Sequence, residues 1–195
     1  MSNYFIILAS GQSKRFKSKI PKQYNYYKNK PIFEHSIKKA IDSKLFKGII
    51  LVINSSKYIK KKYHKNIKII KGGKERSDST KIALKFVKKF KPNNIVIHDS
   101  ARPDFSLKLL KKLFKYLKNY NAVVPIVKPT DSVKYENKKN LFNLNRKNLF
   151  YTQTPQAFKF NFLYSLAVNN RKNIQDESSL FIDKGLNVKF IQGED

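Results

Sequence analysis

The chain begins with an apolar run, Tyr4 to Ala9, and a loop of small residues follows it directly. An uninterrupted apolar run of this length, bounded by polar residues, is typical of a strand that is buried on both faces. Such strands belong mostly to parallel sheets, which carry helices on both sides. The first residues of the chain therefore favour an α/β fold.

The rest of the chain repeats this arrangement. Helical spacing of apolar residues follows Pro31, Ser79 and Ser106, in segments that alternate with further strand-like runs. The alternation predicts one α/β domain over residues 1–195, with a Rossmann-like, mostly parallel sheet and helices on both faces. In such a fold, ligands bind at the carboxyl ends of the strands. The further runs are Ile49–Ile53, Ile67–Ile70, Ile95–Ile97, Ala122–Val127 and Val188–Ile191.

Residues 129–150 break the alternation. Two strand-like segments, Thr130–Tyr135 and Leu141–Leu144, flank a polar turn at residues 136–140. This pattern is typical of a β-hairpin. A hairpin of this length need not pack on the parent sheet, so we expect a protruding arm that pairs with a second copy of the chain.

The loop after the first strand has the composition of a phosphate site. Gly11 allows the backbone to approach a phosphate closely, and backbone N–H groups there can form an anion nest. Arg15 and Lys22 add two positive charges that can stabilise a phosphoryl group during transfer. We therefore expect this loop to bind a polyphosphate.

The formal net charge of +29 raises a second hypothesis, a basic protein that binds nucleic acid or an anionic membrane. Only five of the 42 basic residues are arginine, and the lysines are scattered along the whole chain. We interpret the lysines as a solvated surface, and we expect neither nucleic acid nor membrane as a partner. Arginine, in contrast, is expected where its two-pronged hydrogen bonding is needed.

Several other classes of protein are disfavoured. The chain has no cysteine, which excludes disulfides and thiolate metal sites. It has no P-loop motif, and no dinucleotide-binding glycine motif follows the first strand. The first apolar run is too short for a membrane span and lacks a basic leader, so we expect a cytoplasmic protein.

Two further clusters follow predicted strands. In the cluster Gly72–Thr80, the glycines permit a tight turn beside a ligand, and the helix that follows favours an anion at its N-terminus; an ordinary strand-to-helix turn is the alternative. In the cluster His98–Pro103, Asp99 can hold Mg²⁺ and Arg102 can bind a phosphate. A buried Asp–Arg ion pair is the alternative there, and His98 is expected to satisfy a local hydrogen bond.

Two later segments carry weaker signals. Ser132 and Arg146 flank the predicted hairpin and can bind a phosphorylated substrate, although surface decoration is the alternative. The segment Thr152–Phe158 contains a proline and reads as a turn, with Gln153 and Gln156 fixing the loop through backbone hydrogen bonds.

Taken together, these motifs closely resemble the 2-C-methyl-D-erythritol 4-phosphate cytidylyltransferases of the non-mevalonate isoprenoid pathway. The family pattern runs A-A-G-x-G-x-R, P-K-Q-Y, G-G-x-x-R-x-x-S-V, H-D-A-A-R-P, D-T, a late arginine and T-P-Q. The matches in this chain occur in the same order, at Ala9–Arg15, Pro21–Tyr24, Gly72–Thr80, His98–Pro103, Asp131-Ser132, Asn145-Arg146 and Thr154–Gln156. Each motif alone is weak evidence for the family, but seven motifs in the same order are specific to it.

The resemblance implies a nucleotidyltransferase fold and a reaction. The phosphate of methylerythritol phosphate would attack the α-phosphorus of CTP and expel pyrophosphate. Arg15, Lys22 and Arg146 would be catalytic, and Asp99 would hold Mg²⁺. Asp99, Arg102, Ser132 and Arg146 would bind the sugar-alcohol phosphate, with the arm reaching across a homodimer. The residues implied for CTP binding are Ala9, Ser10, Gly11, Ser13, Arg15, Lys22, Gly72, Lys74, Ser79 and Ser100.

The chain departs from the family pattern at a few positions. Ser10 and Ser13 replace an alanine and a glycine, Ser132 replaces a threonine, and Lys74 stands where an acid or polar residue is usual. The family also continues after the final E-G with a lysine-containing segment, whereas this chain stops at Asp195. The resemblance thus implies a C-terminally shortened domain or the front part of a bifunctional cytidylyltransferase/cyclodiphosphate synthase. A ribitol-5-phosphate cytidylyltransferase is the alternative within the same chemistry.

Overall fold

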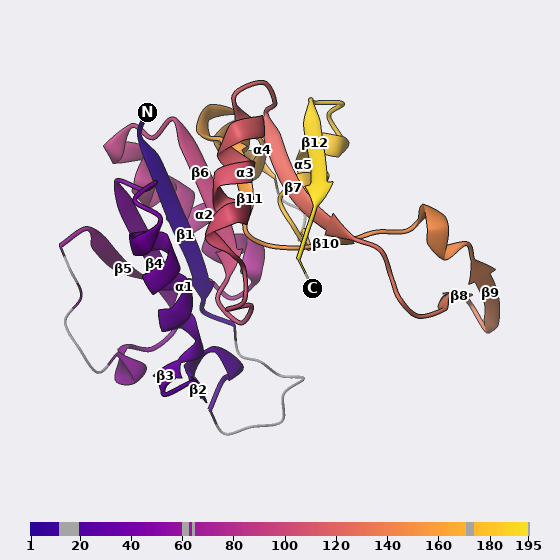
Figure 1. The fold of residues 1–195 in the computed structure, drawn as a ribbon, viewed down its shortest axis with the longest axis horizontal. Helices are drawn as coiled ribbons and strands as arrows, with labels where there is room; N and C mark the ends of the chain where they lie inside the picture. Colours follow the sequence, from indigo (N-terminus) through magenta and orange to yellow (C-terminus); the bar gives the residue numbers. More distant parts are fainter. Residues whose placement is uncertain (12–19, 60–62, 64, 171–173, 195) are drawn as a thin grey trace.

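A computed structural model describes residues 1–11, 20–59, 63, 65–170 and 174–194. Within these residues, eight strands form one sheet in the order β10-β7-β11-β6-β1-β4-β5, and β12 pairs with β7 (Figure 1). The strands of this sheet are β1 (Asn3–Ala9), β4 (Gly48–Ile53), β5 (Ile67–Lys71), β6 (Asn94–Asp99), β7 (Ala122–Val127), β10 (Tyr151–Thr152), β11 (Gln156–Lys159) and β12 (Val188–Gln192).

The sheet is mostly parallel, as predicted. Strands β4 and β6 both run parallel to β1, with Phe5 of β1 opposite Ile49 and Val96. Strand β5 runs parallel to β4, and β12 runs parallel to β7. The carboxyl ends of β1, β5 and β6 therefore lie at one edge of the sheet, where the predicted ligand-binding loops begin.

The segment that was predicted to be a turn, Thr152–Phe158, contains a strand instead. Strand β11 lies between β6 and β7 and runs antiparallel to both. Ala157 and Phe158 are fully buried and pack into the two opposite cores of the sheet. Backbone pairing on both sides and these two side chains hold the strand, although its local sequence is short and half polar.

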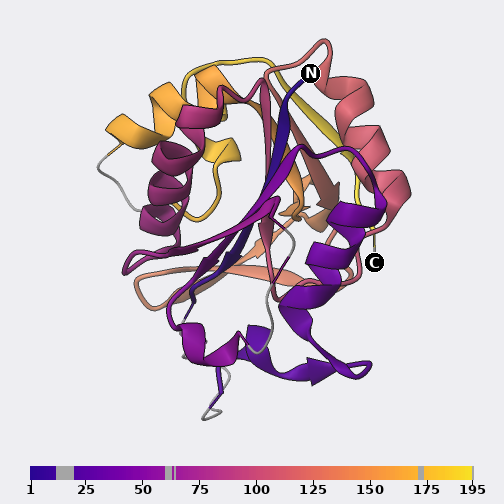
Figure 2. The same ribbon diagram turned by 90° about the vertical axis from the view of Figure 1, so that its left-hand side faces the viewer.

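Helices cover both faces of the sheet (Figure 2). Helices α1 (Ile32–Asp42) and α3 (Leu107–Leu117) pack against one face, where Phe5 and Ile7 of β1 point. Helices α2 (Arg76–Val87), α4 (Phe160–Asn169) and α5 (Ser178–Ile182) pack against the other face, where Tyr4, Ile6 and Leu8 point. Successive side chains of β1 point to opposite faces of the sheet, so this one buried strand contributes to both hydrophobic cores.

The starts of two helices follow from local chemistry. The Ser106 hydroxyl accepts a hydrogen bond from the backbone N–H of Leu109 at 3.0 Å and caps α3, as its position predicts. Helix α2 begins earlier than the apolar spacing from Ser79 predicts, because Glu75 and Asp78 form a reciprocal capping box ahead of it. This start places Arg76 in the first turn of the helix.

The predicted arm is present and extends away from the sheet (Figure 1). Strands β8 (Val133–Asn137) and β9 (Asn140–Leu144) pair only with each other within the described residues. The turn between them is Lys138–Lys139, tighter than the predicted five-residue turn. The short helix η5 (Arg146–Asn148) leads from the arm back to β10.

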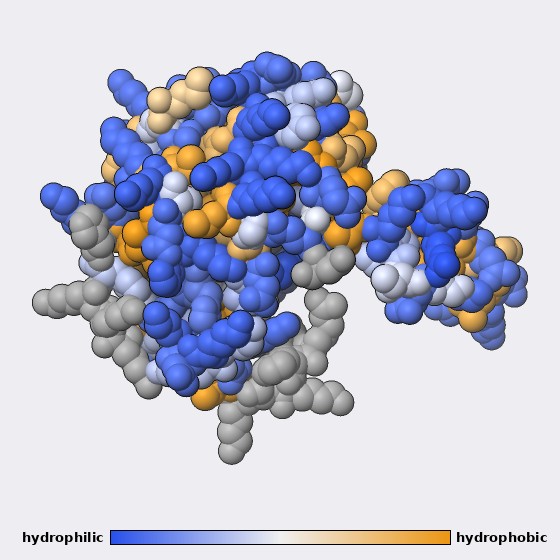
Figure 3. Space-filling model, in the orientation of Figure 1, coloured by the Kyte–Doolittle hydropathy of each residue, from blue (hydrophilic) through white to orange (hydrophobic). Residues whose placement is uncertain are grey.

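Short elements complete the description. A two-stranded ribbon, β2 (Tyr26–Tyr27) and β3 (Lys30–Pro31), precedes α1, and three further single-turn helices are η2 (Lys22–Tyr24), η3 (Ser56–Tyr58) and η4 (Lys88–Phe90). No helix in the described part of the chain is long and apolar enough to cross a membrane. On the face in Figure 3, hydrophilic residues predominate on both the body and the arm, with hydrophobic patches between them.

Candidate active site

A cavity of about 520 Å³ opens at the carboxyl edge of the sheet. Three loops build it, and each of them follows a parallel strand: the loops after β1, β5 and β6. Residues of η2 and of the start of α2 also line it. The lining residues are Leu8, Ser10, Gly11, Lys22, Gln23, Gly73, Lys74, Glu75, Arg76, Asp99, Ser100, Ala101 and Arg102.

The loop after β1 is held from behind by η2. The side-chain amide of Gln23 donates hydrogen bonds to the carbonyls of Ala9, at 2.9 Å, and Gly11, at 2.7 Å. The Tyr24 hydroxyl donates to the same Ala9 carbonyl at 2.8 Å, and Asn54 donates to the Ser10 carbonyl. These hydrogen bonds engage the carbonyls of Ala9, Ser10 and Gly11 and so fix the conformation of the loop.

The loop after β5 packs tightly against the first loop. The hydroxyls of Ser10 and Ser79 lie 2.8 Å apart, and the Ser79 hydroxyl also accepts a hydrogen bond from the Gly73 N–H at 3.1 Å. A Cβ atom on Gly72 would lie 2.5 Å from Ser10 Cβ, so this position requires glycine. The backbone of Gly72 therefore packs against the Ser10 side chain, and the two loops form one wall.

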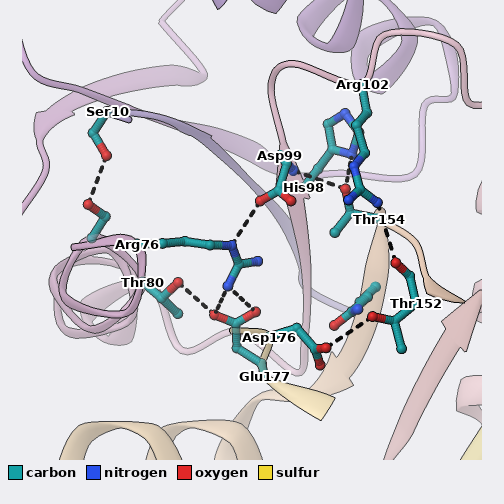
Figure 4. Close-up of polar contacts among 12 residues, drawn as sticks. Ser10, Arg76, Thr80, His98, Asp99, Arg102, Thr152, Thr154, Asp176 and Glu177 are labelled. Atoms are coloured by element: carbon teal, nitrogen blue, oxygen red, sulfur yellow. Dashed lines mark hydrogen bonds and ion pairs between the residues drawn. The ribbon is translucent and has the colours of Figure 1, made fainter. Parts of the chain in front are cut away.

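A charge cluster joins β6, α2 and the residue before α5 beside the cavity (Figure 4). Its Glu177 side chain is fully buried, whereas the Arg76 and Asp99 side chains are 26% and 30% exposed. Arg76 Nε donates to Asp99 Oδ1 at 2.9 Å, and Arg76 Nη1 donates to the two Glu177 oxygens at 2.8 and 3.0 Å. The Thr80 hydroxyl donates to Glu177 Oε1 at 2.8 Å. One arginine thus links two carboxylates that lie on different elements.

The cluster sets the charge of its members. Burial works to raise the pKa of Asp99, but the positive charge and hydrogen bond of Arg76 outweigh it, so this pKa lies below its ordinary value. Burial raises the pKa of Glu177, and Arg76 and Thr80 oppose that shift. Burial also disfavours the charged form of Arg76, but Glu177 and Asp99 more than compensate and raise its pKa. Arg76 and Asp99 are therefore both ionised at neutral pH.

His98 lies directly behind Asp99 and is fully buried. Its Nδ1 atom lies 3.1 Å from the Thr154 hydroxyl and its Nε2 atom lies 3.1 Å from the Ser36 hydroxyl. Burial lowers the pKa of His98 to about 3, so the ring is neutral. This confirms the expected local role of His98. The Thr154 hydroxyl also accepts a hydrogen bond from the Asp99 backbone N–H at 3.1 Å and thereby fixes the end of β6.

A second cavity, of about 480 Å³, shares Arg76, Asp99 and Arg102 with the first. Its other lining residues come from the return of the arm and from the segment before α5, and the Thr152 hydroxyl donates to Asp176 Oδ2 at 3.0 Å across it. Arg76 Nη2 and Gln156 Oε1 are buried there without a hydrogen-bond partner in the described chain. The remaining lining residues are Thr152, Thr154, Gln156, Gln175 and Asp176.

Most of the predicted site residues meet at these loops. Ser10, Gly11, Lys22, Lys74, Ser100, Asp99 and Arg102 line the first cavity. Ala9, Gly72 and Ser79 do not line it, but they shape its wall from behind through the contacts described above. Ser13 and Arg15 lie outside the described residues.

The two predicted residues of the arm, Ser132 and Arg146, lie apart from both cavities. Both side chains are exposed, and Arg146 Nη1 donates a hydrogen bond to the Thr130 carbonyl at 2.6 Å. A single chain therefore does not bring Ser132 and Arg146 to Asp99 and Lys22.

Sequence reasoning missed three polar residues of this region. Arg76 was noticed only as a position of the family motif. Because the chain has only five arginines, each of them is a candidate for a specific role, and this signal could have identified Arg76. Thr154 was assigned to a structural turn, and Glu177 was not singled out at all. The interpretation of Gln153 and Gln156 as loop-fixing residues is confirmed, because Gln156 donates to the Gln153 carbonyl at 3.2 Å and Gln153 donates to the Glu194 carbonyl at 2.6 Å.

The donor set suits a magnesium ion that is held mainly by phosphates. The described residues contain no cluster of three or more side chains that could bind a metal by themselves. Mg²⁺ commonly takes one or two carboxylates together with substrate phosphates and water. The Asp99 carboxylate lines the cavity, and Arg76 engages only one of its oxygens in the contacts given above. Asp99 can therefore supply one oxygen to a metal–triphosphate complex.

The comparison with known proteins decides the family. Residues 4–195 match the family model described as IspD, 2-C-methyl-D-erythritol 4-phosphate cytidylyltransferase. The chain belongs to this family. As a cytidylyltransferase family, it consists of nucleotidyltransferase enzymes, and neither the ribitol phosphate alternative nor the nucleic-acid alternative is favoured.

Individual relatives agree with the family model. The bifunctional enzyme IspD/IspF of Pelagibacter ubique is 46% identical over the whole chain, and the chain spans 53% of that relative. The cytidylyltransferase of Thermosipho melanesiensis is 34% identical over 98% of the chain and is covered to 89%. The chain thus spans about half the length of a bifunctional IspD/IspF relative and most of the length of a monofunctional one.

Solved IspD structures have the same fold. The bifunctional IspDF from Campylobacter jejuni has a TM-score of 0.87 and 28% identity, and the match covers all of this chain and 50% of that one. The IspD structure from Francisella tularensis has a TM-score of 0.84 and 27% identity, and the match covers all of this chain and 91% of that one. The predicted nucleotidyltransferase architecture is confirmed.

Proposed function

We propose that this chain transfers a cytidylyl group from CTP to 2-C-methyl-D-erythritol 4-phosphate. The products would be 4-diphosphocytidyl-2-C-methyl-D-erythritol and pyrophosphate. The observation that carries the proposal is the cavity that brings Lys22, Asp99 and Arg102 together at the ends of parallel strands. Membership of the IspD family supports the choice of both substrates.

The reaction is an in-line displacement at phosphorus. A phosphate oxygen of methylerythritol phosphate forms a bond to the α-phosphorus of CTP, and the bond from that phosphorus to the bridging oxygen breaks. Pyrophosphate leaves with the electron pair of this bond. Because no covalent enzyme intermediate is needed, the protein contributes positioning and charge stabilisation.

The first cavity would bind CTP. Ser10, Gly11 and Gly73 offer backbone surface and small side chains for the nucleoside, and Lys74 and Ser100 lie at the same wall. Lys22 would neutralise the charge that builds up on the phosphates in the transition state. Arg15 is assigned the same role from the sequence motif.

Mg²⁺ is part of the proposal. Asp99 would supply one carboxylate oxygen to it, and the triphosphate would supply the others. When bound, the ion would neutralise phosphate charge and favour departure of pyrophosphate. The described chain contributes the orientation of Asp99, which Arg76 and the backbone contact to Thr154 fix.

The second substrate would lie beside Asp99 and Arg102, between the two cavities that share these residues. Ser132 and Arg146 would come from the arm of a second copy, because the arm of the same chain points away from the site (Figure 1). Exposed apolar side chains on the arm, among them Leu141 and Phe142, support pairing with another chain. We therefore propose a homodimer.

The proposed location is the cytoplasm, because CTP is an intracellular metabolite. The partners in this proposal are small phosphorylated molecules and a second copy of the chain. The scattered lysines would serve solubility.

Pyrophosphate release tests the function. The purified protein is incubated with CTP, Mg²⁺ and either methylerythritol phosphate or ribitol 5-phosphate. We expect release with methylerythritol phosphate, and much faster than with ribitol 5-phosphate. Faster release with ribitol 5-phosphate would show that ribitol 5-phosphate, and not methylerythritol phosphate, is the acceptor substrate. No release with either compound would overturn the proposal.

A further inference from the structure

We propose that Glu177 is a positioning residue for cytidylyl transfer, and that it acts by holding Arg76 so that Arg76 orients the Asp99 carboxylate. The inference rests on the proposed function. Glu177 lines neither cavity and its side chain is fully buried, so it cannot touch a substrate. Its effect on the reaction must pass through Arg76.

The geometry gives Glu177 control over Arg76. The two Glu177 oxygens lie 2.8 and 3.0 Å from a single nitrogen, Nη1, of Arg76. The guanidinium group is planar and rigid, so fixing Nη1 also fixes the direction of the Nε–H bond. That bond points to Asp99 Oδ1 at 2.9 Å. The position of Glu177 therefore sets the orientation of the carboxylate at the end of β6.

Charge gives a second reason for this role. Arg76 lines the cavity that would hold a triphosphate, and an arginine with no buried partner would turn towards phosphate. Glu177 holds Arg76 back from the phosphates.

The Thr80 hydroxyl gives Glu177 a second hydrogen-bond donor beside Arg76. The Thr80 hydroxyl donates to Glu177 Oε1 at 2.8 Å, from the turn of α2 that follows Arg76. The contacts that Glu177 makes with Arg76 and Thr80 are all with hydrogen-bond donors, and together they hold both of its carboxylate oxygens in place. Thr80 is itself buried, so its hydroxyl serves the cluster and not the solvent.

A merely structural ion pair would have different consequences. Loss of a structural contact lowers the free energy of unfolding and leaves the kinetics of the folded enzyme unchanged. Loss of a positioning contact lowers kcat in folded protein, leaves CTP binding nearly intact, and has no effect once Asp99 has been neutralised. The coupling between Glu177 and Asp99 therefore separates the two roles.

The experiment compares Glu177→Gln with wild type, in the native background and in an Asp99→Asn background. Thermal unfolding checks the fold, pyrophosphate release gives kcat, and calorimetry gives the Kd for CTP. We expect Glu177→Gln to lower kcat by about 10- to 100-fold, with the Kd changed by less than about threefold. In the Asp99→Asn background the same substitution should change kcat by less than about twofold.

Two further variants complete the design. Asp183→Asn removes an exposed acid just after α5 and should leave kcat unchanged, which controls for the loss of one negative charge. Thr80→Val removes one hydrogen bond to Glu177 and should lower kcat by about fivefold, again only when Asp99 is present. It carries the test if Glu177→Gln does not fold.

The outcomes are distinct. An active wild type together with a folded Glu177→Gln variant of unchanged kcat would overturn the positioning role and leave the proposed function standing. Equal losses of kcat in both backgrounds would also overturn it. A wild type that releases no pyrophosphate would instead remove the proposed function on which the inference rests.

Discussion

Arg76 Nη1 lies within 3.0 Å of both carboxylate oxygens of Glu177, whose side chain is fully buried. The pair between Lys38 and Asp42 is shorter, at 2.6 Å, but both of its side chains are largely exposed. Water and salt screen an exposed pair, whereas a buried carboxylate that loses its partner has no water to replace it. Burial and not distance therefore decides which pair stabilises the fold.

The first prediction follows from this contrast. Arg76→Met should lower the free energy of unfolding by about 3–5 kcal/mol, because it leaves Glu177 buried without a counter-ion. Lys38→Met, the matched control, should change it by less than about 0.5 kcal/mol. Urea unfolding measures both. The double variant Arg76→Met/Glu177→Leu should return to within about 2 kcal/mol of wild type; no recovery would mean that Arg76 stabilises the fold by other contacts.

The second prediction concerns Lys22, which lines the cavity proposed to bind CTP. Lys22→Ala should lower kcat by about 10²–10³-fold, because the charge of Lys22 is needed most as negative charge builds up in the transition state. The Kd for CTP, measured by calorimetry, should rise by less than about threefold. Lys68→Ala, on the exposed edge of β5, is the control and should change neither value. Equal losses in kcat and in CTP affinity would mean that Lys22 acts by binding CTP in the ground state.

Much of the fold was predictable because the central parallel strands β1, β4 and β6 are built on continuous apolar runs. Strand β11 was not, since it has only Ala157 and Phe158 as apolar residues and follows a proline. Its place between β6 and β7 depends on backbone pairing with strands that are distant in sequence. Local sequence does not contain that information.

The same division applies to the site. The loops with Lys22, Asp99 and Arg102 could be assigned because parallel strands end at one edge of a sheet. Glu177 could not, because its contact with Arg76 joins residues 101 positions apart. The residues next to Glu177 in the sequence do not show that its side chain is buried, because acidic residues are also common at exposed helix N-termini.

The third prediction uses the buried His98. Burial lowers its folded pKa to about 3, so between this value and the ordinary pKa of 6.5 only the unfolded chain takes up the proton. The free energy of unfolding should therefore fall as the pH is lowered, by about 1.4 kcal/mol per pH unit below about pH 6. In urea unfolding from about pH 6 to about pH 5, His98→Gln should lose this slope, whereas the wild type should show it. An unchanged slope in His98→Gln would assign the proton to another group.

The fourth prediction tests the wall of the cavity proposed to bind CTP. A Cβ atom on Gly72 would lie 2.5 Å from Ser10 Cβ and 2.8 Å from Ser79 Oγ, so Gly72→Ala must push the two loops apart. We expect a loss of about 1–3 kcal/mol in stability and weaker CTP binding. Ser10→Gly in the same chain removes the nearest atoms and should restore part of both. If Ser10→Gly brings no recovery, the two loops do not meet as described.

The fifth prediction asks which chain supplies Arg146. The arm carries Arg146 away from the cavity that contains Lys22, so each site of a dimer would combine Lys22 of one chain with Arg146 of the other. Chains with Lys22→Ala and chains with Arg146→Ala should each be nearly inactive alone. A heterodimer of the two would have one intact site, because one chain keeps Lys22 and its partner keeps Arg146.

Co-expression of the two variants measures this directly. Random pairing makes half of the dimers mixed, and each mixed dimer has one of two sites intact, so the specific activity should be about a quarter of wild type. If Arg146 served its own chain, both sites of a mixed dimer would lack a residue and no activity would return. Leu141→Asp/Phe142→Asp chains provide the control, since a charged arm should lower both dimer mass in sedimentation and recovery of activity.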